Sequence, residues 1–532
     1  MSTPPPTASE PSRPRTYFGW QQEQVAFLYG MSGHRFALVA VAILAAVWPL
    51  AASNLQAGII TWPVAAVLGV LAFLRVGGRT VDEWLTAAVS YGIGRMGGQH
   101  KFASAAFAPP AKTAAPDAPR PADLPGVLAP LTILEAEMPD GAPLAIAHHR
   151  HDKTFTAVAR IRFPGIGLVD SSRREQRVAG WGALLAGLCT EGSPITRVQA
   201  LQRLVPESGA ALRRWDRDHT DPDSPDLADR VVTGLLGAAT LATSSREAYL
   251  AFTMDGRKAA RVIKHAGGGT VGAAAVLTRQ LRAQYAAIAG ADLQIEAWLG
   301  PRDLAEVLRT AFDPHSARHL AERRATATGV RAGQLSVAAA DDGEGETGGL
   351  EAGVDPAVAG PAAAEARPGV YTHDGAHSVT FWVHSWPRNE VYATALAPLL
   401  GEGVHRRAFS FHVEPLGPRD AEREVMRERT ARSVAVKMRQ KSGQIVPEHE
   451  QVALDRARAQ DAERAAGHGL VRIAAYVTLT VTNADDVEDA CAALEADAAA
   501  ARIELRRMWF AQDIGFAMGA LPLGYGLPKK RW

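Results

Sequence analysis

Cysteine is scarce in this 532-residue sequence, and neither sign of charge is in excess. Cys189 and Cys491 are the only cysteines, and their spacing fits neither a zinc site nor a redox pair. Each lies in an apolar i, i+3, i+4 pattern, so both are predicted to be reduced core thiols of a cytoplasmic protein. The 57 basic and 56 acidic residues give a net charge of +1, which argues against a surface that coats nucleic acid.

One long segment lacks charge altogether. No charged residue occurs from Phe36 to Leu74, and neither half of this segment has a polar face. Phe36–Ser53 and Ala57–Leu74 are each long enough to cross about 30 Å of hydrocarbon. Trp48 and Trp62 flank the polar turn between them and are predicted to be membrane anchors at the membrane–water boundary. The sequence therefore predicts a transmembrane hairpin over residues 36–74, with a buried hairpin of a soluble protein as the alternative.

Basic residues on both sides of the hairpin predict its orientation. Positively charged flanks favour the cytoplasmic side of a membrane. A two-pass cell-membrane protein with both termini in the cytoplasm is therefore expected, with residues 1–35 as a cytoplasmic N-terminal segment. The arginines on which this prediction depends are Arg13, Arg15, Arg35, Arg75, Arg79 and Arg95.

Residues 79–101 are predicted to contain an amphipathic helix. Thr80 and Glu83 have the spacing of a capping box, and Trp84 lies on the apolar face that follows. A helix of this kind directly after a membrane span is expected to lie along the cytoplasmic surface, with Trp84 as a third membrane anchor. Docking of the helix onto the cytoplasmic body is the alternative.

Two breaks in composition divide the remaining chain. Residues 103–126 are rich in alanine and proline and are predicted to be a semi-rigid linker. Residues 336–369 are acidic and rich in small side chains and are predicted to be disordered. The two breaks delimit a first cytoplasmic unit at 127–335 and a second at 370–532.

Strand-like and helix-like patterns alternate in both units, which predicts an α+β fold. Within this pattern, residues from about Pro194 to Leu204 are predicted to be helical. The sequences that start at Asp292 and Arg502 occupy matching places near the ends of the two units, which favours two related ferredoxin-like units. Residues 419–467 are rich in charged helix formers and are predicted to form a two-helix arm, either solvated or docked to a neighbouring subunit.

No catalytic, cofactor or metal site is predicted. Gly267–Gly269 lies in AGGGTVGAA, the one glycine-rich loop able to cradle a phosphate, but this loop lacks the lysine of a P-loop. His148, His149 and His151 are close in sequence but have no distant acid or cysteine that would complete a metal site. A membrane-tethered enzyme that uses the glycine-rich loop for a nucleotide is kept as an alternative.

The sequence resembles proteins of conjugative, type IV-like secretion systems. RTYFGWQQEQ, the two apolar segments and GRTVDEWLTAAVSYGIGR resemble the PrgI-type two-pass membrane subunits. WGALLAGLCTEGSPITRVQALQRLVPES, SREAYLAF and FAMGALPLGYGLPKKRW resemble the domain that precedes the motor in large conjugation ATPases. The resemblance implies a non-catalytic, actinobacterial-type structural subunit of an oligomeric complex. Its partners would be the lipid bilayer, other channel subunits and a separate P-loop ATPase, because this sequence has no Walker lysine.

The resemblance also implies which end of the chain meets the motor. Pro522, Leu523, Lys529, Lys530 and Arg531 are the residues expected to dock it. An EccE-like subunit of a type VII secretion system is the alternative, because it also has two N-terminal spans and a cytoplasmic α/β body. Neither interpretation requires direct binding of nucleic acid.

Overall fold

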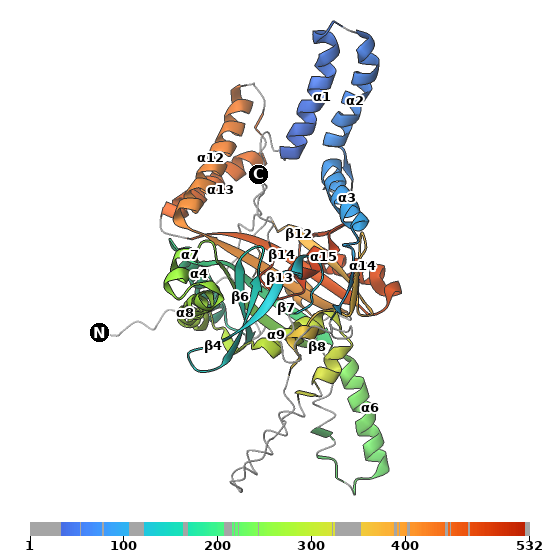
Figure 1. The fold of residues 1–532 in the computed structure, drawn as a ribbon, viewed down its shortest axis with the longest axis vertical. Coiled ribbons are helices and arrows are strands. Elements are labelled where there is room, and N and C mark those ends of the chain that lie inside the picture. Colours follow the sequence, from blue (N-terminus) through green and yellow to red (C-terminus); the bar gives the residue numbers. More distant parts are fainter. Residues whose placement is uncertain are drawn as a thin grey trace, which may run out of the picture.

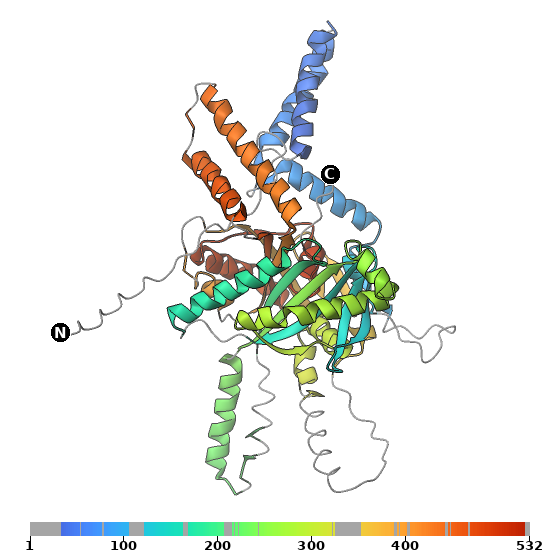
Figure 2. The same ribbon diagram turned by 90° about the vertical axis from the view of Figure 1, so that its left-hand side faces the viewer.

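The computed structural model shows a mixed α+β protein, as the sequence predicts: a large sheet flanked by helices, with helical pairs that project from it (Figures 1 and 2). Predictions for residues 1–32, 106–121 and 325–352, and for the tail beyond Gly526, lie outside the described residues. The structure describes residues 33–53, 55–76, 79–105, 122–162, 169–206, 215–216, 219–221, 223–242, 244–321, 323–324, 353–387, 391–392, 394–401, 405–441, 445–446, 448–465 and 469–526.

A helical pair projects from one side of the body (Figure 1). It consists of α1 (Gly33–Ala51) and α2 (Leu55–Phe73), which pack against each other. A short antiparallel ribbon, β1 (Arg75–Val76) with β2 (Arg79–Thr80), then leads into α3 (Val81–Met96). The predicted amphipathic helix of residues 79–101 is therefore present as α3, and it lies on the body directly below the pair.

Within the described residues, a 13-stranded sheet forms the centre of the body. Its main path runs β3-β10-β11-β12-β14-β13-β7-β8-β6-β5-β4, with β15 paired to β12 and β9 paired to β6, and every pairing is antiparallel. The strands are β3 (Lys101–Ala103), β4 (Leu131–Glu137), β5 (Pro143–His149), β6 (Thr154–Arg162), β7 (Ile195–Pro206), β8 (Ser244–Asp255), β9 (Gln294–Trp298), β10 (Ala363–Ala366), β11 (Tyr371–His373), β12 (Ala376–Ser385), β13 (Arg406–Leu416), β14 (Leu470–Val481) and β15 (Glu504–Arg507).

Helices cover both faces of this sheet. One face packs against α4, α8 and α14, and the other packs against α9, α15 and the chain that follows α15. The helices and 3-10 turns of the body are η2 (Gly126–Leu128), α4 (Ser171–Leu188), α6 (Asp226–Ala242), α7 (Ala260–His265), α8 (Gly269–Gly290), α9 (Pro301–Phe312), η3 (Pro356–Val358), α11 (Ala397–Leu400), α12 (Pro418–Lys441), α13 (Glu448–Ala465), η4 (Ala484–Asp486), α14 (Val487–Ala500) and α15 (Gln512–Gly519).

Two parts of the sheet have the same topology. Along the chain, the first part runs β6-α4-β7-β8-α8-β9, with α6 inserted after β7 and α7 before α8, and its strands lie in the spatial order β9-β6-β8-β7. The second runs β12-α11-β13-β14-α14-β15, with α12 and α13 inserted after β13 and η4 before α14, and its strands lie in the order β15-β12-β14-β13. In both, the fourth strand lies beside the first and the third separates the first from the second, which is the β-α-β-β-α-β ferredoxin-like arrangement.

The two predicted matching positions are equivalent in this topology. Asp292 and Arg502 each stand between the second helix and the last strand of their part, and both have left-handed backbones, with φ of 57° and 56°. Their amides close the same turn, Asp292 donating to the carbonyl of Ala289 and Arg502 to that of Ala499, each at 2.9 Å. The similarity that the sequence shows at these positions is thus a similarity of local conformation.

The predicted helix from Pro194 to Leu204 is wrong, because Ile195–Leu204 belong to strand β7. This strand joins the two parts of the sheet, with β8 on one side and β13 on the other. Val198 and Leu201 point to opposite faces and both are buried. A strand buried on both faces lacks the period-2 alternation that identifies a half-buried strand, so pairing with distant neighbours decides its conformation.

Parts of both predicted linkers are ordered and buried. Leu124 of the 103–126 segment is 1% exposed, and Ala359 of the 336–369 segment is fully buried, so predicted disorder is wrong for residues 353–369. A Cβ at Gly360 would lie 2.0 Å from the carbonyl oxygen of Asp123. A small residue at position 360, which suggests a linker in the sequence, is needed in the structure for a different reason. The segments around Gly360 and Asp123 pass too close to each other beside α9 to leave room for a side chain.

Both cysteines lie in the core, as predicted. Cys189 and Cys491 are free thiols, and both are buried. Burial raises the pKa of Cys491 to about 11, so this thiol stays protonated at neutral pH.

Candidate membrane-facing and docking surfaces

The sides of the α1–α2 pair are apolar and exposed. The indole Nε1 of Trp62 donates a hydrogen bond to the carbonyl of Ala46 at 3.2 Å and so links the two helices. Trp48 is 58% exposed and Trp62 44%. The other large apolar side chains exposed on the pair are Val41, Ile43, Leu44, Val47, Leu50, Ile59, Ile60, Val64, Val67, Val70 and Phe73.

One helix of the pair is long and apolar enough to cross a membrane by itself. That helix is α2, over Gln56–Phe73, and only 11% of this stretch is buried in the protein. The apolar stretch of α1, Leu38–Ala51, is shorter. A buried hairpin within a soluble core, the alternative from the sequence, is therefore wrong: the pair stands outside the body.

Helix α3 docks onto the body through its aromatic side chains. The ring of Trp84 lies 6.2 Å from that of Trp509 and 6.0 Å from that of Phe510, the second contact being edge-on. Tyr91, two turns later, packs on Phe510 at 5.5 Å and donates a hydrogen bond from its hydroxyl to the carbonyl of Ala366 at 3.0 Å. These contacts hold α3, and through it the helical pair, against the second part of the sheet.

The prediction that Trp84 anchors in the membrane is therefore corrected, because its ring is packed on protein. The face of α3 turned away from the body instead carries Leu85, Val89, Ile93 and Met96, which are 52–84% exposed. Their spacing of four, four and three residues places them in one stripe along the helix. The sequence could not show that the ring of Trp84 would pack against Trp509 and Phe510, which lie more than 400 positions later in the chain.

Replacing Trp84 by alanine should loosen α3 without releasing the protein from membranes. Two aromatic ring contacts are lost, each contributing about 0.5–1.5 kcal/mol, so amide hydrogen exchange in α3 should accelerate at least about 10-fold. Exchange measured by mass spectrometry on the full chain, together with alkaline carbonate extraction of membranes, checks both parts. Met96→Ala, on the exposed stripe, is the control and should leave exchange unchanged. Carbonate release of Trp84→Ala would restore the anchoring role.

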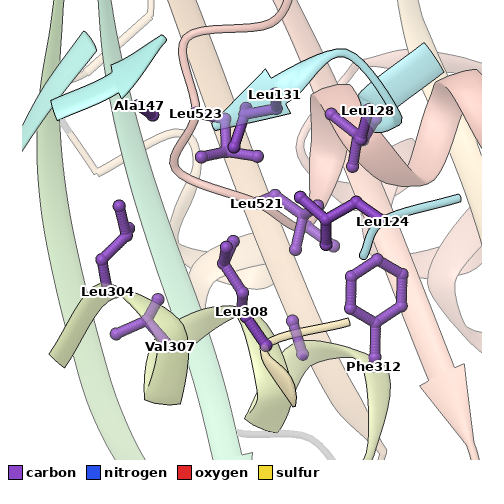
Figure 3. Close-up of a cluster of buried hydrophobic side chains, with 14 of the residues drawn as sticks. Leu124, Leu128, Leu131, Ala147, Leu304, Val307, Leu308, Phe312, Leu521 and Leu523 are labelled. Carbon is purple, nitrogen blue, oxygen red and sulfur yellow. The ribbon is translucent and has the colours of Figure 1, made fainter. Parts of the chain in front are cut away.

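The C-terminal segment Leu521–Gly526 lies inside the body rather than at a docking surface. Leu521 is fully buried and Leu523 is 4% exposed, and Pro522 between them is also buried. Figure 3 shows the two leucines among side chains of α9 and of the chain around β4. The expectation that Pro522 and Leu523 contact a motor is thus corrected, whereas Lys529, Lys530 and Arg531 lie outside the described residues.

Gln199, at the junction strand β7, holds this segment in place. Its amide nitrogen donates to the carbonyl of Leu521 at 2.8 Å, and its amide oxygen accepts from the backbone nitrogen of Gly524 at 2.7 Å. The same nitrogen donates to the Ser410 hydroxyl of β13 at 2.8 Å. One buried side chain therefore links both parts of the sheet to the C-terminal segment.

Helix α6 is a second exposed apolar surface. It projects from the side of the body opposite to the α1–α2 pair (Figures 1 and 2). Leu227, Val231 and Leu235 are 53–67% exposed and recur every four residues, so they form one stripe. We name these three residues the α6 stripe.

The predicted two-helix arm is present as α12 and α13. It rises on the same side of the body as the α1–α2 pair (Figure 2). Ion pairs cross between its helices, from Arg429 to Asp461 at 2.7 Å and from Arg439 to Glu450 at 2.8 Å. The i, i+4 pair expected within α12 is also present, with Arg432 donating to Glu428 at 3.3 Å.

The glycine-rich loop and the histidine group both have a role in the local structure. Gly267, Gly268 and Gly269 have φ of 103°, 72° and 59°, values that favour glycine, and they lead into α8. His148 stacks on a phenylalanine, and His149 bonds the carbonyl of Val127 at 2.9 Å. Among the residues that the structure describes, no group of three or more histidine, cysteine or acidic side chains is arranged to hold a metal.

Comparison with known protein families and with curated proteins finds no match for this chain.

Proposed function

We propose that this chain is a non-catalytic, two-pass inner-membrane subunit of a conjugative, type IV-like secretion machine, in which it forms a docking platform for a separate P-loop ATPase. The observation that carries the proposal is the exposed α1–α2 pair, which has no charged residue from Phe36 to Phe73 and is held to a large sheet by α3. An apolar surface of this extent requires a cover, and a bilayer covers all sides of the pair at once.

The dimensions of the pair fit a bilayer. Helix α2 has 19 residues, or about 28 Å at 1.5 Å per residue, close to the roughly 30 Å of hydrocarbon in a membrane. The apolar stretch of α1, Leu38–Ala51, is shorter and spans about 21 Å. The outer ends of the pair, Gly33 and Phe73, both lie on the side of the body (Figure 1), so a membrane around the pair leaves these ends and the body on one side, which we infer to be the cytoplasm. The exposed stripe of α3 then faces the headgroup region, where an amphipathic helix is stable.

The same orientation makes α6 the membrane-distal end of the protein. Because Pro522 and Leu523 are buried, we place the motor-facing surface on the α6 stripe. Exposed leucine and valine side chains at helical spacing fit a groove of a partner protein. This assignment replaces the C-terminal segment as the docking site and is tested separately from membrane insertion.

Affinity purification of the tagged full chain from native membranes in mild detergent tests the proposal. A conjugation-type ATPase should be recovered in stoichiometric amount, and Val231→Asp with Leu235→Asp should lower its recovery at least about 10-fold, because two charges would be buried at the contact. Val271→Asp, at a residue of α8 that is 76% exposed, is the matched control and should not change recovery.

Other results separate the alternatives. Recovery of a type VII ATPase with several FtsK-type domains would assign the protein to that machine as an EccE-like subunit. Complete release of the wild-type chain from membranes by alkaline carbonate would overturn the membrane assignment itself. Unchanged ATPase recovery with the α6 variant would remove the docking surface but leave membrane insertion standing.

A further inference from the structure

A cavity of about 250 Å³ lies at the edge of the sheet where β7 ends and β13 begins. β13 starts at this edge with Arg406 and runs toward α12, so the cavity lies at the end of the strand away from the arm. None of the described residues that line it is acidic. Its polar lining consists of Arg406, Arg318, His315, His405, Thr480 and Thr482.

We propose that this cavity binds a small phosphate-bearing anion from solution, with the guanidinium of Arg406 as its principal donor. The proposal does not depend on the function proposed above. It rests on three observations: Arg406 is buried, the acidic groups that act on it are paired with other arginines, and the cavity wall has no acidic residue among those described.

Arg406 is a buried cation without a hydrogen-bond acceptor among the described residues. The residue is 9% exposed, and its Nη2 atom is buried without a partner. A buried charge is costly unless it is paired and hydrogen-bonded, so native proteins rarely leave one in this state. An anion in the cavity would supply the missing acceptor.

The acidic side chains that act on Arg406, Glu247 and Asp313, are already paired with other arginines. Glu247 accepts two hydrogen bonds from Arg203, at 2.6 and 3.0 Å. Asp313 pairs with Arg309 at 3.1 Å. These carboxylates and the Tyr249 hydroxyl act on Arg406 only at longer range.

Arg406 nevertheless keeps its charge at neutral pH. Burial, together with repulsion from Arg203, lowers the pKa of Arg406 to about 10. This value is far enough above 7 for the guanidinium to remain protonated. The cavity therefore presents a permanent positive charge that has been partly stripped of solvent.

The chemistry of the cavity favours phosphate. A guanidinium presents a planar fork of donors that matches two oxygens of a carboxylate or a phosphate. Phosphate carries the higher charge and has further acceptor oxygens for the other donors of the cavity wall. The two histidines and Arg318 add further donors or positive charge around the same space. The volume suits a phosphate with a small substituent and is below the range of about 300–1,000 Å³ usual for larger ligands. Free phosphate and a small organic phosphate share this chemistry.

Binding to the full chain in phosphate-free detergent buffer tests the proposal. Inorganic phosphate, glycerol 3-phosphate and acetate are titrated separately, by calorimetry and by thermal unfolding. Phosphate or glycerol 3-phosphate should bind saturably and raise the Tm, and the tighter of the two identifies the source, whereas acetate should bind at least about 10-fold more weakly. Arg406→Met should weaken phosphate binding at least about 10-fold.

The variant also separates a binding role from a structural one. Without phosphate, Arg406→Met should unfold at the same temperature as the wild type or higher, because removal of a buried cation without a hydrogen-bonded partner outweighs the loss of its long-range attraction to Glu247. Arg407→Met is the matched control: the neighbouring arginine is paired with Asp497, so this variant should unfold at a lower temperature yet bind phosphate normally. Arg406→Lys keeps the charge but loses the fork, and should bind with intermediate affinity.

Three results would overturn the proposal. The first is a wild-type chain that shows no saturable binding of either phosphate compound. The second is Arg406→Met with unchanged phosphate affinity. The third is Arg406→Met that fails to fold or unfolds at a lower temperature while Arg406→Lys binds phosphate as the wild type does, which would assign Arg406 a structural role.

Discussion

A chain that ends at Ala520 is expected to lose its native fold. The truncation removes Leu521 and Leu523 from the cluster beside α9 and leaves the amide of Gln199 without two of its backbone partners. Deleting a buried leucine side chain costs about 2–5 kcal/mol, and an unsatisfied buried polar group costs about 1–3 kcal/mol more. The sum approaches the whole stability of a typical domain, about 5–15 kcal/mol.

Thermal unfolding and limited proteolysis of the purified chain measure this effect. A chain that ends at Gly526 is the matched control, because it keeps every buried contact of Leu521–Gly526 while lacking Lys529, Lys530 and Arg531. The control should fold as the full chain does, so its recovery of an ATPase tests the basic tail alone. A cooperative, unshifted transition in the chain that ends at Ala520 would show that Leu521 and Leu523 contribute little to the core.

Replacing Glu247 by glutamine should give the second large loss of stability. Glu247 is the ion-pair partner of Arg203, which is 2% exposed and also donates to the carbonyl of Val307 at 2.9 Å. Breaking a buried pair from one side leaves a charge without compensation, which typically costs about 3–5 kcal/mol. Because the Glu247 side chain is 35% exposed, solvent screens part of the interaction, and we expect about 2–3 kcal/mol.

The pH dependence of stability should reveal the contribution of the same Arg203–Glu247 ion pair. Burial alone would raise the pKa of Glu247, but the charge of Arg203, aided by Arg406, outweighs it and holds the pKa at about 2, below the ordinary 4.5. A lowered pKa in the folded state stabilises the protein above about pH 4.5, and this contribution is lost as the pH falls toward 2. The Tm difference between wild type and Glu247→Gln should therefore be constant from pH 7 to 5 and shrink below pH 4.5. A difference independent of pH down to 3 would contradict this account.

Several features of the fold follow from local sequence. The absence of charge from Phe36 to Leu74 is enough to predict an apolar helical pair, because neither helix would have a polar face that could be turned toward water. The recurring order of strand and helix favours two related units, but it does not give β7 of the first part, where the sequence predicts a helix. The matching of Asp292 with Arg502 reflects a turn built from adjacent residues. These features depend on periodicity and neighbouring residues, which are visible in one sequence.

The docking surfaces depend on contacts between distant residues. Trp84 has the same apolar character whether it meets lipid or Trp509, so only the packing of α3 on the body decides its partner. Pro522 and Leu523 follow the last helix and suit an exposed docking segment equally well by composition. The hydrogen bond from Gln199 to Leu521, across 322 positions, accompanies their burial.

The sequence by itself determined the apolar pair, the arm and the α+β class, because each depends on a local pattern of polarity. Only the tertiary structure decided that β7 is a strand, that both parts share one sheet and that the C-terminal segment is core. It also brought Arg406 to a cavity without acidic residues. The physical reason is the same in each case: a local pattern specifies which side of an element is apolar or charged, whereas the partner of that side is chosen by long-range packing.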